Sequence, residues 1–251
     1  MSDRSLQRCF IGTSGWSYAA WKDGFYAGVP RRRWLRHCAE RFGGIEVNMT
    51  FYREPRAQVL DSWVAGTPPA FAFACKGHRR ITHIQRLAGI EAALARQRDS
   101  LRPLGTRLKA MLWQLPASLE RDLDRLAAFA RALAGWAEVA HAIEFRHPSW
   151  FDDAVADCLA RRRIAICISD AGKWPRWDRV TAPAVYVRLH GRPETYASGY
   201  GAEALADWAA KVAGWLGQGR TVHVYFDNDA RGAAPYDAMR LIELVRPRVK
   251  A

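Results

Sequence analysis

The sequence Ala140-His141-Ala142-Ile143-Glu144-Phe145-Arg146-His147-Pro148-Ser149-Trp150 decides the fold. Its apolar beginning, Ala140–Phe145, predicts a buried strand, and a helix-like segment follows from Asp152. Where this strand ends, Glu144 supplies a carboxylate, Arg146 a guanidinium and His147 an imidazole. Because an unpaired charge is costly to bury, such groups need partners from other parts of the chain. The stretch therefore predicts a buried strand that delivers a polar site at its end.

The same arrangement recurs along the chain. Eight apolar runs predict strands at Cys9–Thr13, Ile45–Asn48, Phe71–Lys76, Leu108–Gln114, Ala140–Phe145, Ile164–Ser169, Ala184–Leu189 and Thr221–Phe226. Amphipathic segments predict helices at Arg31–Phe42, Arg56–Ala65, Glu91–Leu101, Glu120–Leu133, Asp152–Arg162, Ala202–Leu216 and Tyr236–Val245. Strands that alternate with helices are typical of a parallel sheet, and at 251 residues the usual closure is a barrel. We therefore predict an α/β fold, a (β/α)8 TIM-type barrel, as a single domain over residues 1–251.

Two features bear on this prediction. An open doubly wound sheet is the alternative, but no glycine-rich dinucleotide fingerprint follows the first strand. The connection Asp170–Pro183 contains Gly172, Pro175 and two tryptophans, which predicts a loop instead of a helix.

The chain carries a net charge of +13 and has a pI of about 10. Such a charge favours anionic partners, including nucleic acid. The basic clusters Arg31–Arg33 and Arg161–Arg163 fall on predicted helices, which is typical of a solvated surface. We therefore expect attraction to small anions, and at most weak, salt-sensitive binding of nucleic acid.

The sequence predicts a cytoplasmic protein. No run of about 18 apolar residues is present, so we expect no contact with a membrane interior. Met1–Arg8 lacks the apolar core of a signal peptide. The five cysteines are scattered, which favours a reducing compartment. Nothing in the sequence specifies an oligomeric state.

Side chains alternate between the two faces of a strand, and five of the runs place polar groups on one face. The polar members are Glu46 and Asn48, Lys76, Glu144 and Arg146, Arg188 and His190, and Asp227. We expect this face to point into the barrel, with its charges at the carboxyl ends of the strands, where barrel enzymes place their chemistry. Charges on five strands favour a functional site over ion pairs that merely close the barrel.

The chain resembles the YecE-like family, also called the domain of unknown function 72 family. The resemblance runs nearly end to end and is carried by Gly12–Tyr18 (GTSGWSY), Phe25-Tyr26, Glu46–Pro55 (EVNMTFYREP), Phe73–Gly77 (FACKG), Thr82-His83, Trp113–Pro116 (WQLP), Glu144–Trp150 (EFRHPSW), Tyr186–Arg192 (YVRLHGR) and Tyr225–Asp229 (YFDND). It implies a TIM-type barrel and no activity. Asp227 departs from the family pattern, where we expect Asn, and adds a carboxylate to the site.

Glu46 and Glu144 are the candidate acid/base pair, because two carboxylates in different environments can divide proton transfer between them. The alternative is a structural role, in which Arg146 holds Glu46 or Arg188 holds Glu144. Lys76 is the third candidate catalytic residue. A Schiff base would require a lowered pKa, and a neighbouring glutamate would raise it, which favours ion pairing or anion binding for Lys76.

Arginines at strand ends predict a clamp for a carboxylate or phosphate. The full set of predicted substrate-binding residues is Trp16, Asn48, Tyr52, Gln114, Arg146, His147, Trp150, Asp170, Arg188, His190, Asp227 and Asn228. A divalent metal on His190 and the carboxylates is a further interpretation, but no compact His/carboxylate motif supports it. We predict neither a metal nor another cofactor.

These residues favour an enzyme, a hydrolase or isomerase, that acts on a small anionic substrate. The alternatives are a nucleic-acid-binding or nucleic-acid-processing protein and a non-catalytic ligand-binding barrel. A retaining glycosidase is disfavoured, because the fourth and seventh strands end in Gln114 and His190 instead of two glutamates.

Overall fold

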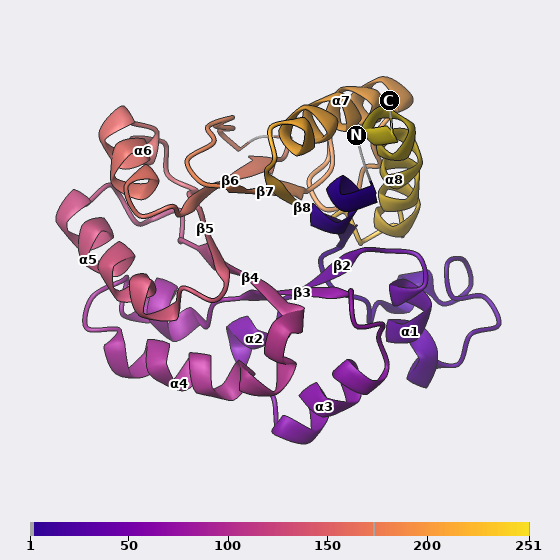
Figure 1. Cartoon of the computed structure of the whole chain (residues 1–251), viewed down its shortest axis with the longest axis horizontal. Helices are drawn as coiled ribbons and strands as arrows, with labels where there is room; N and C mark the ends of the chain where they lie inside the picture. Colours follow the sequence, from indigo (N-terminus) through magenta and orange to yellow (C-terminus); the bar gives the residue numbers. More distant parts are fainter. Residues whose placement is uncertain (1–2, 173, 251) are drawn as a thin grey trace.

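The computed structural model describes residues 3–172 and 174–250. Eight strands form the centre: β1 (Cys9–Thr13), β2 (Gly44–Val47), β3 (Ala72–Lys76), β4 (Leu108–Gln114), β5 (Ala140–Glu144), β6 (Ala165–Asp170), β7 (Ala184–Leu189) and β8 (Thr221–Phe226). Around them lie α1 (Trp34–Ala39), α2 (Met49–Tyr52), α3 (Ala57–Ala65), α4 (Glu91–Leu101), α5 (Leu123–Leu133), α6 (Asp153–Ala160), α7 (Ala202–Gly217) and α8 (Ala234–Lys250) (Figure 1). The strands pair in parallel in the order β1-β8-β7-β6-β5-β4-β3-β2, which confirms the predicted TIM-type barrel.

The barrel closes between β1 and β2, where the two backbones come very close. The Gly43 N–H donates to the Ile11 carbonyl at 3.1 Å, and the Gly15 N–H donates to the Glu46 carbonyl at 2.8 Å. A Cβ added to Gly12 would lie 1.9 Å from the Gly44 carbonyl oxygen. This contact between β1 and β2, the seam of the barrel, therefore requires glycine at position 12.

We expect Gly12→Ala to lower the free energy of unfolding by about 2–3 kcal/mol, because the new methyl group forces the two backbones apart. Chemical denaturation measures this loss. The matched control is Gly214→Ala in α7, where an added Cβ meets nothing within 4 Å. Since alanine favours a helix over glycine, that variant should equal or exceed the wild type. Equal stability of Gly12→Ala and wild type would contradict the tight seam.

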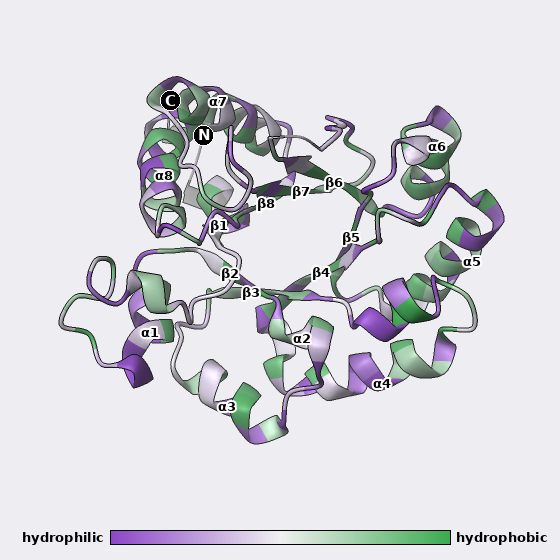
Figure 2. Cartoon of the chain, turned by 180° about the vertical axis from the view of Figure 1, so that it is seen from behind, coloured by the Kyte–Doolittle hydropathy of each residue, from purple (hydrophilic) through white to green (hydrophobic). Residues whose placement is uncertain are grey.

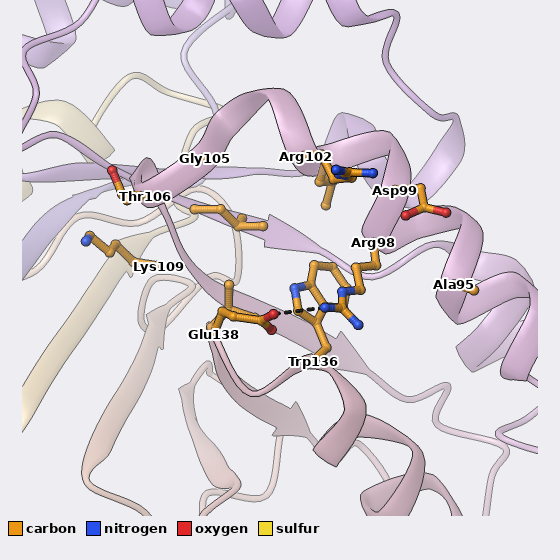
Figure 3. Close-up of a pocket in the computed structure, with 12 residues that line it drawn as sticks. Ala95, Arg98, Asp99, Arg102, Gly105, Thr106, Lys109, Trp136 and Glu138 are labelled. Atoms are coloured by element: carbon orange, nitrogen blue, oxygen red, sulfur yellow. Dashed lines mark hydrogen bonds and ion pairs between the residues drawn. The ribbon is translucent and has the colours of Figure 1, made fainter.

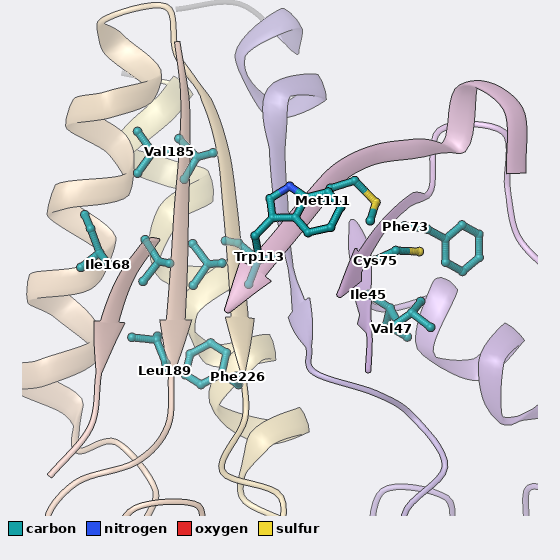
Figure 4. Close-up of a cluster of buried hydrophobic side chains, with 14 of the residues drawn as sticks. Ile45, Val47, Phe73, Cys75, Met111, Trp113, Ile168, Val185, Leu189 and Phe226 are labelled. Atoms are coloured by element: carbon teal, nitrogen blue, oxygen red, sulfur yellow. The ribbon is translucent and has the colours of Figure 1, made fainter. Parts of the chain in front are cut away.

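The two faces of the strands differ as the alternation predicts. Apolar side chains such as Phe73, Trp113 and Phe226 are buried in the layer between strands and helices (Figure 4). The helices carry hydrophobic and hydrophilic segments in alternation, as expected when one side packs on a barrel (Figure 2). A separate buried cluster fills the inside of the barrel and includes Ala74, Leu112 and Tyr186.

The predicted helices differ from the observed ones mainly at their ends. Arg31–Phe42 divides into a 3-10 turn at Arg31–Arg33 and the short helix α1. In the segment from Asp170 to Pro183, the described residues after β6 form no helix, as predicted, and Lys173 lies outside the described residues. Among the helices of the described chain, none is long and apolar enough to cross a membrane.

Candidate functional site

Arg188, at the carboxyl end of β7, lies at the centre of a buried charge cluster. Its side chain donates from Nη2 to Glu46 Oε1 at 2.8 Å and from Nη1 to Glu144 Oε2 at 3.0 Å. Nη2 also reaches Asp227 Oδ2 at 2.8 Å. Arg188 is 1% exposed, so one buried guanidinium holds three carboxylates that come from β2, β5 and the end of β8.

Glu46 is fully buried, and hydroxyl groups satisfy its remaining acceptor positions. The Tyr186 hydroxyl donates to Oε2 at 2.7 Å, and the Ser14 hydroxyl donates to Oε1. The Asn48 amide donates to Ser14 Oγ at 2.7 Å, which fixes the serine in turn. Glu46 is therefore held by a network that joins the ends of β1, β2 and β7.

Glu144 is equally buried and is also bound from several sides. The Ser169 hydroxyl donates to Oε1 at 2.9 Å, and Arg146 Nη2 lies 2.7 Å from the same oxygen. Burial opposes ionisation, but Arg146 and Arg188 outweigh it and hold the pKa of Glu144 well below its usual range. Arg146 thus pairs with Glu144 and not with Glu46, which Arg188 binds instead, whereas the pairing of Arg188 with Glu144 that the structural alternative named is observed.

Arg146 lies at the border between this cluster and solvent. Its guanidinium carbon is 3.4 Å from the centroid of the Trp174 ring, a close cation–π contact. The Trp174 ring in turn meets Tyr196 at 5.7 Å in an edge contact. Arg146 Nε is buried and has no hydrogen-bond partner within the described chain. A donor left unpaired at the open end of the barrel suits a ligand oxygen.

Lys76, the last residue of β3, behaves differently from the arginines. Its Nζ lies 4.5 Å from the centroid of the Phe51 ring. In the part of the chain that the structure describes, no carboxylate oxygen comes within 4.0 Å of this amine. Burial, with a contribution from Arg188, lowers the pKa of Lys76 to about 8, against the opposing effect of Glu144, Glu46 and Asp227. The glutamates do raise this pKa, as expected from the sequence, but burial and Arg188 outweigh them, so the net shift is downward.

Asp227 and Asp229 follow β8, and their pKa values are shifted in opposite directions. Burial raises the pKa of Asp227, but Arg188 and His190 outweigh it and bring the value to about 2. His190 Nδ1 lies 3.0 Å from Asp227 Oδ2. Burial and the charge of Asp227 raise the pKa of Asp229 to about 9. Asp229 is therefore a neutral carboxyl group beside an ionised one at pH 7.

Several predicted residues lie at the edge of this cluster. Gln114 is half-buried and donates to the Leu115 carbonyl at 3.0 Å. Asp170 is buried and accepts from Arg192. His147 accepts from the Ser149 N–H at 3.2 Å and so begins the 3-10 turn Pro148–Trp150. These residues support the strand ends and do not contact the carboxylates that Arg188 holds.

Four predicted residues are not brought into the cluster. Trp150 is fully buried, donates to the Leu119 carbonyl at 2.7 Å and stacks on Phe145 in the apolar layer. Asn228 donates to the Ser198 carbonyl and to Asp237, which ties two loops together. Trp16 packs edge-on against Trp63. Tyr52 is 66% exposed on α2.

Sequence reasoning missed other residues that the fold brings to the site. They are the hydroxyl partners Ser14, Ser169 and Tyr186, the ring of Trp174, and His83 and Asp229. The strand alternation places Tyr186 on the same face as Arg188, but Tyr186 was not among the predicted site residues. Burial, together with Lys76 and other cations, lowers the pKa of His83, which favours its neutral form. Trp174 lies in a loop, where no periodic signal exists.

A separate cavity lies at the other end of the barrel. It has a volume of about 630 Å³ and is lined by Arg98, Arg102, Lys109 and Glu138, near the starts of β4 and β5 (Figure 3). Arg98 Nη2 pairs with Glu138 at 2.8 Å across it. None of the predicted site residues lines this cavity. Within residues 3–172 and 174–250, no group of three His, Cys, Asp or Glu side chains is placed to hold a metal ion.

The sequence and the fold match a family of barrel proteins. A family model described as "Protein of unknown function DUF72" matches residues 10–251, so the chain belongs to that family. The UPF0759 protein YecE of Escherichia coli (strain K12) is 29% identical over 143 residues, which cover 57% of this chain and 50% of YecE. The matched region thus spans about half the length of that relative. The UPF0759 protein YunF of Bacillus subtilis (strain 168) is 23% identical over 94% of both chains.

Solved structures of the same family share the fold. A DUF72 family protein of Thermotoga maritima MSB8 superimposes with a TM-score of 0.81 at 25% identity, covering 95% of this chain and 99% of that one. A DUF72 family protein of Enterococcus faecalis V583 gives a TM-score of 0.80 at 21% identity, with 95% of both chains covered. The resemblance seen in the sequence is confirmed.

Proposed function

We propose that this protein is an enzyme that acts on a small anionic substrate at the carboxyl end of its barrel, with Lys76 as the proton-transfer group. The observation that carries the proposal is the environment of the Lys76 amine, which is half-buried beside Phe51 and has no carboxylate within 4.0 Å in the described chain. Its pKa of about 8 lies close to neutral pH, where proton transfer by a side chain is most efficient.

The anionic character of the substrate rests on Arg146. Its guanidinium is fixed by Glu144 on one side and by Trp174 on the other, so little side-chain entropy is lost when it binds a ligand. Its unpaired Nε and the Lys76 amine are donors without protein acceptors among the described residues. A carboxylate or phosphate group satisfies such donors better than a neutral group does.

The carboxylates enter this proposal in a different role from the acid/base pair that the sequence suggested. Glu144 accepts hydrogen bonds from Ser169 and Arg188 and pairs with Arg146, and its low pKa makes it a poor proton donor. Glu46 likewise accepts from Arg188, Tyr186 and Ser14. We assign both glutamates to the positioning of the arginines, which leaves hydrolysis or isomerisation to proceed through Lys76.

A screen of anionic metabolites tests this proposal. Wild-type protein is incubated with mixtures of phosphorylated sugars, nucleotides and carboxylic acids, and consumption is followed by NMR and mass spectrometry. We expect at least one compound to be consumed, and Lys76→Met to be about 100-fold to 10,000-fold slower, the usual contribution of acid/base catalysis. The matched control is Lys109→Met, an exposed lysine at the opposite end of the barrel.

Two results would argue against the proposal. Turnover by Lys76→Met at the wild-type rate would remove Lys76 from the mechanism. Binding of anions without any turnover, seen as a thermal shift that Arg146→Met abolishes, would instead favour a ligand-binding barrel.

A further inference from the structure

We infer that Lys76 is a covalent catalyst, whose amine condenses with the carbonyl group of a small anionic oxo compound to form a Schiff base. The inference rests on the proposed function, because it concerns the same site and specifies the class of substrate. It adds a bond between enzyme and substrate, which acid/base catalysis alone does not require.

The backbone of Lys76 is rigidly placed. It ends β3, and its carbonyl accepts from the Thr50 hydroxyl at 2.7 Å and from the Gln97 amide at 3.5 Å. The Phe51 ring, from the adjoining helix α2, contacts the amine. A nucleophile on a strand end with these supports is held in a narrow range of positions, as covalent catalysis requires.

Burial of the Lys76 amine favours its neutral form, which is the form that attacks a carbonyl group, and Arg188 adds to this effect against the opposing charges of Glu144, Glu46 and Asp227. Arg188 takes up the charges of Glu46, Glu144 and Asp227, so none of these carboxylates pairs with the ammonium of Lys76. The His83 ring meets the same Phe51 ring that the Lys76 amine contacts, with a centroid distance of 4.9 Å. With a pKa of about 8, Lys76 carries roughly 200-fold more neutral amine at pH 7.5 than an ordinary lysine.

The same surroundings define the substrate. Lys76 ends β3 and Arg146 follows β5, so both lie at the carboxyl end of the barrel, and the Arg146 Nε is unpaired among the described residues. We therefore assign the anionic group of the substrate to Arg146 and its carbonyl group to Lys76, which makes the substrate class an oxo acid or a phosphorylated aldehyde or ketone.

The covalent step balances without an oxidant or reductant. The neutral Lys76 nitrogen attacks the carbonyl carbon, the carbon–oxygen π bond breaks, and the proton that the nitrogen loses passes to the oxygen to give a carbinolamine. The hydroxyl group then leaves as water with a second proton, and a carbon–nitrogen double bond forms. The resulting iminium withdraws electrons from the neighbouring carbon, which favours proton abstraction or carbon–carbon cleavage there. We assign the exchange of these protons with solvent to His83, because its half-buried ring meets the same Phe51 ring that the Lys76 amine contacts.

Reductive trapping tests the inference. The protein is incubated separately with glyoxylate, pyruvate and dihydroxyacetone phosphate in the presence of sodium cyanoborohydride at pH 7.5, and adducts are located by peptide mass spectrometry. We expect Lys76 to be labelled by at least one probe more than 10-fold faster than Lys22 and Lys109, which are exposed. Arg146→Met should slow labelling by the anionic probe dihydroxyacetone phosphate at least 10-fold more than it slows labelling by neutral dihydroxyacetone.

The outcomes separate this inference from the proposed function. Labelling of Lys76 no faster than that of Lys109 by all three probes would overturn the Schiff base. If Lys76→Met still abolished turnover in the metabolite screen, acid/base catalysis by Lys76 would stand without it. Rapid labelling of Lys76 in a protein that consumes no metabolite would support the reactive amine and count against the proposed enzyme.

Discussion

Arg188→Met should lower the melting temperature by roughly 10 °C or more, the largest effect that we expect from a single substitution. The change leaves Glu46, Glu144 and Asp227 buried without the cation that all three share. Removing one partner from a buried ion pair costs about 3–5 kcal/mol, and for a domain of this size each kcal/mol shifts the melting temperature by about 2–4 °C. Calorimetry or circular dichroism at pH 7.5 measures the shift.

The control for this variant is Arg192→Met. Arg192 also pairs with a buried carboxylate, Asp170, but its own side chain is 46% exposed, so water can replace it. We expect its melting temperature to stay within a few degrees of wild type. Arg188→Lys should fall between the two, because an ammonium keeps the charge but not the fork that reaches three carboxylates. A melting temperature of Arg188→Met equal to that of wild type would mean that the cluster contributes nothing to stability.

Asp229→Asn should stabilise the protein, and the gain should grow with pH. In the unfolded chain this carboxyl group ionises near pH 4, whereas in the fold its pKa is about 9. Between these values the unfolded state has released a proton that the folded state retains, so wild-type stability is lost as pH rises. The variant has no such proton, and its advantage should increase by up to about 1.4 kcal/mol per pH unit between pH 5 and 8.

The charge of Asp227 supports this sign, because it adds to burial in raising the pKa of Asp229. Tyr18 and Arg188 act in the opposite direction, but the Tyr18 hydroxyl donates to the Ser14 carbonyl and Arg188 is engaged with other carboxylates. Denaturation in urea at pH 4, 6 and 8 measures the difference, with Asp61→Asn on the exposed side of α3 as the control for loss of one acidic group. A difference that does not change with pH would show that Asp229 is ionised in the fold.

The two variants, Arg188→Met and Asp229→Asn, test the two ways in which the cluster accommodates buried acidic groups. Arg188 removes the electrostatic cost of three carboxylates, while Asp229 avoids that cost by keeping its proton. The cluster therefore holds two kinds of buried acid within a few residues of each other, at Asp227 and Asp229. Such a division is typical of functional sites.

The strands, and the face of the strand on which each residue lies, follow from the amino-acid sequence alone. Alternation along Thr221–Phe226 and Ala184–Leu189 separates apolar from polar side chains, and the same rule assigns Arg188 and Glu144 to the inside of the barrel. These signals are local, because each depends on the hydrophobicity of neighbouring residues and on the period of a strand. The predicted bounds of β1, β4, β7 and β8 agree with the observed strands for the same reason.

Only the tertiary structure decided which charges meet. Glu46 and Arg188 are 142 residues apart, and their contact depends on closure of the barrel at Gly12 and on the length of the arginine side chain. The packing of the barrel also leaves Lys76 without a carboxylate partner in the described chain. It directs the hydrogen bonds of Trp150 and Asn228 away from the site. Alternation along a strand assigns each side chain to a face of the sheet. Which charged side chains form ion pairs depends on distances of a few ångströms between strands that are remote in sequence. Those distances arise from the packing of the whole barrel.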